Sequence, residues 1–458
     1  MEKRSINGFK NGEENSGLLA TKNKKYIYII LVLLFTIIFK TNCIDSWNRN
    51  YSGFQYDSED LVIGEITAVR YNIDTGWYGL GRMNYKEPEK GYVSEKIYKE
   101  KGNSQENLCF LPYDSQIGLQ GKVFSLISSV IYSSQWIGIF KWINCLLLAL
   151  VIVYILYLLN LKYSTCFSFV WGITFLFSPW IVNFAPNLYW VEFTWFLPML
   201  IGLLIVSDKV NFKFKTPVLF CATFIAIFIK SLCGYEYLST IMLSMVLFIV
   251  SDLVKGIVTC NKEEVKRLFK ILFGISICGL LGFALALCIH GYYRGNGDIF
   301  NGLNNIYQQD ILRRTSLGND ANFQTNNLAI KSSLEASIGS VVKMYFDYYK
   351  NYFHYNILLW IDGRNFRLMT FLASVFILLR IYCRKFTQKN NIEYLTLLFL
   401  SMIASLSWII LAKSHSYIHI HMNYVLWFFG YVQMCLFIIL DTSLNLLKEF
   451  MNEGEKNV

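Results

Sequence analysis

The chain of 458 residues is 54% hydrophobic and only 16% charged, whereas about a quarter of the residues in soluble domains carry a charge. This composition excludes one or two soluble domains of that length and indicates a polytopic membrane protein. A net charge of +10 would fit a nucleic-acid partner if Lys and Arg formed one soluble face, but they flank the apolar segments instead, so we expect a lipid bilayer and no nucleic acid as partner.

Apolar runs of about 17 to 22 residues, the length that crosses a bilayer as a helix, recur along the chain. Strand alternation is nowhere sustained, which argues against a barrel. We therefore predict an all-α polytopic membrane protein with about ten transmembrane helices. The expected spans are 26–43, 141–161, 163–182, 189–207, 216–232, 236–254, 271–290, 366–382, 394–412 and 423–442.

The positions of the basic residues predict the orientation. Lys22, Lys24 and Lys25 precede the first span, which we interpret as a retained anchor because no small-residue cleavage site follows it. The short connections on the same side are basic, as the positive-inside rule requires, so we expect a multi-pass protein of the bacterial cytoplasmic membrane with both termini cytoplasmic. The predicted parts are a basic tail (1–25), the first helix (26–43), an extracytoplasmic loop (44–140), helices two to seven (141–290), a second extracytoplasmic loop (291–365), helices eight to ten (366–442) and a cytoplasmic tail (443–458).

Three loop segments have the spacing of amphipathic helices. In the first, Val62, Ile66 and Val69 follow a cap at Asp57 or Ser58, and this helix could lie along the membrane surface. Residues 119–130 precede the second span with a similar pattern, and residues 332–349 repeat it in the second loop. No strand pattern in the first loop is strong enough to predict a separate domain.

The first of these helices begins with a cluster of carboxylates. Asp57, Glu59 and Asp60 would occupy its cap and first turn, where the helix dipole favours the ionised form by about 0.3–1 kcal/mol each. They could act as general bases for an acceptor hydroxyl or as metal ligands, or could serve only as helix caps.

An acid-rich helix start soon after the first span, followed by membrane-parallel helices and many spans, resembles the GT-C superfamily of glycosyltransferases. That resemblance implies a polyprenyl-phosphate sugar donor and an essential acid in the first extracytoplasmic loop. Glu59 is then the first candidate for the base and Asp57 the second, while Asp60 could assist either or bind a divalent ion. Four segments also resemble uncharacterised bacterial multispan proteins, namely Ser58–Gly64, Ser115–Gly121, Cys233–Tyr237 and His415–His419.

A short outer loop before the last span holds three of the five histidines. Lys413 and a protonated His415 or His419 could neutralise a lipid phosphate. His415 and His419 are also four residues apart, a spacing found in metal sites, although no HExxH glutamate accompanies them. The remaining alternative is that the polar side chains of this loop only face the membrane interface and bind no ligand.

Further polar and aromatic residues near the predicted span ends complete the candidate site. Glu236, next to Tyr235, is costly near an apolar region unless it lines a cavity or pairs with Lys230. Trp190 and Glu192 belong to an aromatic cluster that could form an interfacial belt or stack on a sugar. We expect these residues to line a substrate cavity, which Arg82 and the loop that contains Gln116 and Gln120 would complete.

The sequence has no P-loop, no GxGxxG motif and no soluble α/β domain that could bind a nucleotide-linked donor. A glycosyltransferase of this kind would therefore need a sugar donor that is already linked to a lipid. We expect transfer of a sugar from a polyprenyl-phosphate donor to an extracytoplasmic glycan, lipid or protein acceptor. One alternative is a polysaccharide polymerase or ligase in which Arg313 and Arg314 hold lipid pyrophosphate. The other is a transporter or flippase for lipid-linked sugars, which typically has broken helices or repeats.

Overall fold

The computed structural model describes residues 10–43, 54–100, 104–130, 133–321, 323–347, 363–383 and 388–456. Within these residues the regular structure is helical except for one pair of short strands. Six helices in the described part of the chain are long and apolar enough to cross a membrane, which confirms the predicted class of helical membrane protein. They are α5 (Trp136–Lys162), α9 (Lys215–Cys233), α10 (Leu238–Val258), α11 (Lys262–Arg294), α18 (Gln388–Leu411) and α21 (Tyr431–Lys456).

Helices also occupy the other four predicted spans, as α1 (Lys10–Thr41), α6 (Thr165–Phe177), α8 (Phe193–Ile205) and α17 (Gly363–Tyr382). The apolar part of α1 and the whole of α6 and α8 are shorter than a full crossing. α6 ends where Pro179 begins the separate helix α7 (Pro179–Phe184), because proline disfavours helical geometry in the residue before it. The count of ten spans therefore stays a prediction.

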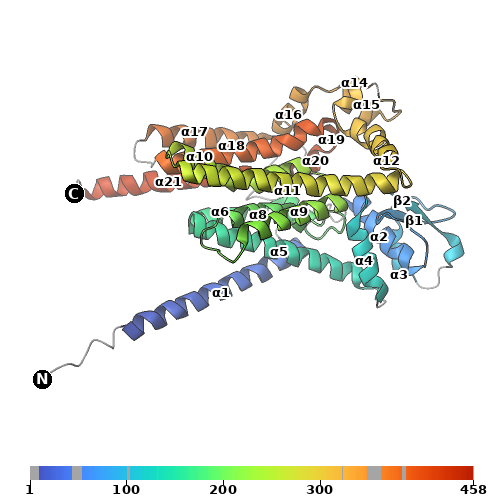
Figure 1. Cartoon of the computed structure of the whole chain (residues 1–458), viewed down its shortest axis with the longest axis horizontal. Helices are drawn as coiled ribbons and strands as arrows, with labels where there is room; N and C mark the ends of the chain where they lie inside the picture. The colour runs from blue at the N-terminus through green and yellow to red at the C-terminus, as the bar shows by residue number, and fades with distance from the viewer. Residues whose placement is uncertain are drawn as a thin grey trace.

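The long helices other than α1 run side by side, and most of the smaller elements gather at one end of the bundle (Figure 1). We call this end the cap end, and it contains residues 54–100, 104–130, 299–321, 323–347 and 413–423. α1 begins and α21 ends at the opposite end, which we call the tail end (Figure 1). The polar segments that the sequence separates by hundreds of residues are thus brought to one end of the molecule.

The first cap segment contains a two-stranded antiparallel sheet among short helices. Its elements are α2 (Tyr56–Arg70), β1 (Gly81–Tyr85), α3 (Ser94–Lys99), the 3-10 turn η2 (Gln105–Asn107), β2 (Leu108–Pro112) and α4 (Leu119–Val130). The two strands pair antiparallel, with Gly81 opposite Pro112 and Tyr85 opposite Leu108. The sequence pattern does not predict them, because each strand has five residues and β2 is apolar without alternation.

α2 lies inside the cap. Residues Glu59–Ala68 are all buried, and the helix packs against β1, α3 and α4. The approach to β1 is so close at Gly64 that a Cβ atom there would come 1.9 Å from the carbonyl oxygen of Gly81. Glu65 forms an ion pair with Lys122 of α4 at 3.0 Å. The expected surface-lying helix is therefore enclosed by the cap over this stretch, while Asp57 in its first turn is exposed.

The second cap segment follows α11. It consists of α12 (Ile299–Ile306), the π-helical turn η3 (Tyr307–Ile311), α13 (Leu312–Arg314), α14 (Leu317–Asp320), α15 (Leu328–Glu335) and α16 (Ile338–Asp347). The helix expected over 332–349 is divided within its described residues, because the chain is extended at Ala336 between α15 and α16, and residues 348–349 lie outside the described part. α12 packs back onto the end of α11, which places the segment over the bundle.

The predicted histidine loop is helical. α19 (Lys413–Ile418) and α20 (Ile420–Asn423) follow α18 and lead into the 3-10 turn η4 (Tyr424–Phe428). α19 packs against α13 and α15. Lys413 donates from Nζ to the carbonyl oxygens of Leu334 and Ala336 at 2.7 and 2.8 Å. Its charge thus satisfies carbonyl groups at the end of α15 that have no partner within the helix.

Ion pairs join the helices towards the tail end. Lys162 of α5 contacts Asp252 of α10 at 2.7 Å, and Lys255 of α10 contacts Glu393 of α18 at 2.6 Å. Arg380 of α17 pairs with Asp441 of α21. Charged groups in apolar surroundings are costly unless they are paired, so these contacts favour one register between neighbouring helices.

Candidate functional site

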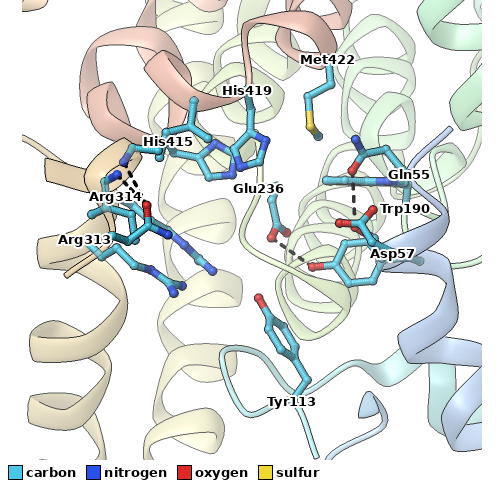
Figure 2. Close-up of a pocket in the computed structure, with 16 residues that line it drawn as sticks. Gln55, Asp57, Tyr113, Trp190, Glu236, Arg313, Arg314, His415, His419 and Met422 are labelled. Atoms are coloured by element: carbon cyan, nitrogen blue, oxygen red, sulfur yellow. Dashed lines mark hydrogen bonds between the residues drawn. The ribbon is translucent and has the colours of Figure 1, made fainter. Parts of the chain in front are cut away.

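A cavity of about 340 Å³ opens at the cap end, where five separate parts of the chain meet. Figure 2 shows Gln55 and Asp57 on one side, Arg313 and Arg314 on the other, and Glu236 between them. The lining residues are Gln55, Asp57, Ser58, Tyr113, Tyr189, Trp190, Glu236, Arg313, Arg314, Asn327, Ala329, Ile330, His415, Ile418, His419 and Met422. Acidic, basic and aromatic side chains therefore share one enclosure.

Asp57 provides the first-loop carboxylate of this cavity. It lies in the open first turn of α2 and is exposed. Gln55, which precedes the helix, has the left-handed backbone conformation with φ 52°, and its side chain also lines the cavity. Behind the helix start, Arg82 donates to the backbone oxygen of Asp57 at 3.4 Å and lies over the ring of Tyr92 at 4.9 Å. Arg82 thus contacts the helix start without lining the cavity.

Glu59, the first candidate for the base, lies elsewhere. Its Oε2 atom is 2.7 Å from Nζ of Lys141 in α5, and its Oε1 atom accepts a hydrogen bond from the backbone N–H of Leu188 at 3.0 Å. The residue is buried and does not line the cavity. Glu59 therefore connects α2 to the bundle, with both carboxylate oxygens engaged.

Asp60 is also buried and outside the cavity. Its Oδ1 atom accepts a hydrogen bond from the backbone N–H of Ser94 at 3.1 Å. Burial raises the pKa of Asp60 to about 6, against the opposing hydrogen bonds from Ser94. The three acids of the predicted cluster thus have three different environments, and only Asp57 faces open space.

The opposite wall of the cavity carries the basic side chains. Arg313 and Arg314 come from α13, and His415 and His419 come from α19 and its C-terminal boundary. The two imidazole rings are 4.4 Å apart between centroids. Burial and the neighbouring His419 lower the pKa of His415 well below its usual range. Burial and His421 lower the pKa of His419 to about 4. Both rings are neutral at pH 7, so the arginines supply the fixed positive charge.

Glu236 and the aromatic residues line the cavity between these two walls. Oε1 of Glu236 accepts hydrogen bonds from Tyr189 at 3.3 Å and Gln116 at 3.4 Å. Trp190 stacks on Tyr237 with ring centroids 5.9 Å apart. Gln120 donates to the backbone oxygen of Tyr189 at 2.8 Å. Gln116 and Gln120 therefore support the lining from behind, while Trp190 and Glu236 face the cavity.

Four other predicted residues lie outside this cavity. Tyr235 interacts through its hydroxyl with Nδ1 of His290 at 3.1 Å. Glu192 is buried, and neither carboxylate oxygen has a hydrogen-bond partner among the described residues. Lys413 bonds the end of α15 instead of the cavity. Lys230, the expected counter-ion of Glu236, donates to the backbone oxygen of Gly234 at 2.5 Å.

A second cavity of about 230 Å³ adjoins the first and is largely apolar. Arg314 lines both cavities. The other lining residues are Ser115, Tyr235, Leu238, Ser239, Phe283, Leu287, Ile306, Asp310, Ile311, Thr315, Trp408, Leu411 and Ala412. A guanidinium group thus marks the boundary between a polar enclosure and an apolar one formed between α10, α11 and α18.

No group of three His, Cys, Asp or Glu side chains that could hold a metal ion occurs in the described part of the chain. His415 and His419 share the cavity with Asp57, but they do not form such a group. The residues present therefore do not fit the divalent ion considered for this site.

Comparison with protein-family models, curated proteins and solved structures gave no match to this chain. Several lining residues carry no motif, among them Tyr113, Asn327 and Met422. For Asn327 the sequence offers one local indication of its position. Asparagine is common at the residue that precedes a helix, and Asn327 caps α15 by accepting hydrogen bonds from the backbone N–H groups of Ala329 and Ile330.

The lowered pKa of His419 predicts a pH-dependent stability. The unfolded chain protonates this ring near pH 6.5, whereas the folded chain does so near pH 4. Stability from this group is therefore present above pH 6.5 and is lost as the pH falls to 4, by up to about 3 kcal/mol. Melting temperatures between pH 7.5 and 4.5 should decline more steeply for the wild-type protein than for His419→Asn. Parallel curves would contradict the prediction.

Proposed function

We propose that the chain is an integral-membrane glycosyltransferase that moves a sugar from a polyprenyl-phosphate donor to a glycan, lipid or protein acceptor. The observation that carries the proposal is the single cavity in which Asp57 faces the arginine pair, with an apolar cavity beside Arg314. Such an arrangement can hold all three parts of the donor. The phosphate meets the guanidinium groups, the sugar lies in the polar cavity, and the hydrocarbon chain enters the apolar one.

The chemistry is assigned to residues that line the cavity. Asp57 accepts the proton of the acceptor hydroxyl as its oxygen bonds to the anomeric carbon of the sugar. The bond between that carbon and the phosphate oxygen breaks, and the electron pair leaves with the lipid phosphate. Arg313 and Arg314 stabilise the charge that develops on this leaving group. Trp190 offers an aromatic face to the sugar, and Glu236 accepts hydrogen bonds from sugar hydroxyls.

The proposal includes an orientation in the membrane. With ten spans and both termini in the cytoplasm, the cap end faces the extracytoplasmic side. The basic tail residues and short basic connections then lie on the cytoplasmic side, in agreement with the positive-inside rule. In this orientation the cavity receives a donor that has already been carried across the membrane, which is consistent with the absence of a nucleotide-binding motif in the sequence.

The test is turnover by the purified full chain in lipid vesicles. Undecaprenyl-phosphate sugars with a radiolabelled hexose, hexosamine or pentose are supplied with a membrane extract as the acceptor source. We expect labelled product with at least one monophosphate donor and none with Arg313→Gln/Arg314→Gln. Product only from undecaprenyl-pyrophosphate donors would indicate the polymerase or ligase alternative. Movement of the donor across the vesicle membrane without product would indicate the transporter alternative.

A further inference from the structure

A buried carboxylate lies behind the arginine pair of the cavity. Asp310 belongs to the π-helical turn η3, and its side chain is 6% exposed. Its oxygens lie 3.2 Å from Arg294, 3.4 Å from Arg313 and 3.7 Å from Arg314. One carboxylate therefore contacts three guanidinium groups. The cluster has a surplus of positive charge, and two of its three arginines line the cavity.

The local sequence explains how this cluster forms. Arg313 and Arg314 follow Asp310 by three and four residues, the two spacings that place side chains on the same side of a helix. Both arginines therefore reach back towards the same carboxylate. Without it, Arg313, whose side chain is 37% exposed, would be free to turn into solvent, and the flexible arginine would lose its defined position.

Asp310 is itself held by the end of α11. Arg294 has a side chain that is 5% exposed, and it donates to Oε1 of Gln309 at 2.6 Å. The same guanidinium group donates to the backbone oxygen of Asp114, the residue after Tyr113, which lines the cavity. His290 also contacts that oxygen at 3.0 Å. Arg294 thus connects Asp310 to α11 and to the first cap segment.

We infer that Asp310 is a positioning residue, which holds the guanidinium groups of Arg313 and Arg314 in the wall of the polar cavity, with Arg314 at the boundary to the apolar one, so that they can bind a phosphate headgroup. The inference rests on the proposed function, because it takes the arginine pair as the phosphate site. Asp310 lines the adjoining apolar cavity and not the polar one. A carboxylate repels a phosphate, so its favourable effect on phosphate binding is exerted through the arginines that it contacts.

The positioning role can be separated from simple electrostatics because the two effects have opposite signs. Replacing Asp310 by Asn removes a negative charge near the site, and that change alone would strengthen the binding of an anion. Loss of the arginine positions would weaken it. A merely structural role would affect neutral and charged ligands alike, whereas lost arginine positions affect only the phosphate.

The experiment measures binding of farnesyl phosphate to the purified full chain in detergent by calorimetry, with farnesol as the neutral comparison. We expect Asp310→Asn to weaken farnesyl phosphate binding about tenfold, as for the loss of one charge-assisted hydrogen bond, and to leave farnesol binding unchanged. The matched control is Glu393→Gln, since Glu393 is equally buried and is paired with Lys255 far from the cavity. This variant should bind both ligands as the wild type does.

Equal or tighter binding of farnesyl phosphate to Asp310→Asn would overturn the inference, as would an equal loss for farnesol. Arg294→Gln/Asp310→Asn is the second test if the single variant does not fold, because it removes the buried charge together with its fixed partner. This double variant should also bind farnesyl phosphate more weakly, and wild-type affinity would again overturn the inference. The proposed function fails separately if Arg313→Gln/Arg314→Gln binds farnesyl phosphate as tightly as the wild type.

Discussion

Asp57→Asn is expected to lower the turnover number by about 10²–10⁴-fold, the range found when a general base is removed. Asn keeps the size of the side chain but cannot accept the proton of the acceptor hydroxyl. Because Asp57 is exposed in the open first turn of α2, the change should leave the melting temperature nearly unaltered. Initial rates at saturating donor and acceptor, compared with the melting curve of the same preparation, measure both effects.

Asp57→Glu is the informative companion of this variant. It keeps a carboxylate in the cavity at a slightly different position, so we expect activity between the wild type and Asp57→Asn. Donor binding should be nearly the same in all three proteins, because the arginine pair that faces the phosphate is unchanged. A fully active and normally folded Asp57→Asn protein would show that another group takes the proton.

The choice between Asp57 and Glu59 illustrates what the sequence could show. Residues two apart on a helix point to nearly opposite sides, so only one of the two acids could face a cavity. Glu59 lies three residues before Val62 and seven before Ile66, on the apolar side of the predicted helix. That spacing was a signal that Glu59 is buried. Its partner Lys141 is 82 residues away in the chain, and no local pattern indicates such a contact.

The fold was more predictable than the details of the cap. Long apolar runs identify helices directly, because few alternatives can bury or solvate them in a membrane. The cap elements are short and held by tertiary contacts, so β1 and β2 have no clear signal in the sequence. Among the candidate site residues, His415, His419, Glu236, Trp190 and Asp57 do line one cavity. Lys413 does not, because its position suits the carbonyl groups at the end of α15.

Breaking the pair of Glu59 and Lys141 is expected to have the largest effect on stability. Removing one partner of a buried ion pair typically costs about 3–5 kcal/mol, since the other charge is left uncompensated. The two sides of this pair are unequal, with side-chain exposures of 5% for Glu59 and 25% for Lys141. Lys141→Met leaves the buried carboxylate of Glu59 without its counter-charge, so we expect its loss in the free energy of unfolding to fall in this range. Glu59→Gln leaves a lysine that can extend towards solvent, so its cost should be smaller.

Denaturant unfolding of the purified proteins in detergent measures both costs. Glu59→Gln/Lys141→Met should recover part of the stability lost in Lys141→Met, because no unpaired charge remains. The control is Lys96→Met, which breaks an exposed pair with Glu89 and should change the free energy of unfolding by less than about 1 kcal/mol.

These measurements also decide how a loss of activity in Glu59 variants is understood. If Glu59 only joins α2 to the bundle, the activity lost in Glu59→Gln should follow the fraction of protein that is unfolded, and folded molecules should turn over at the wild-type rate. Conditions that restore folding, such as lower temperature, should then restore activity. A Glu59→Gln protein that is as stable as the wild type yet inactive would make Glu59 the base and would remove that role from Asp57.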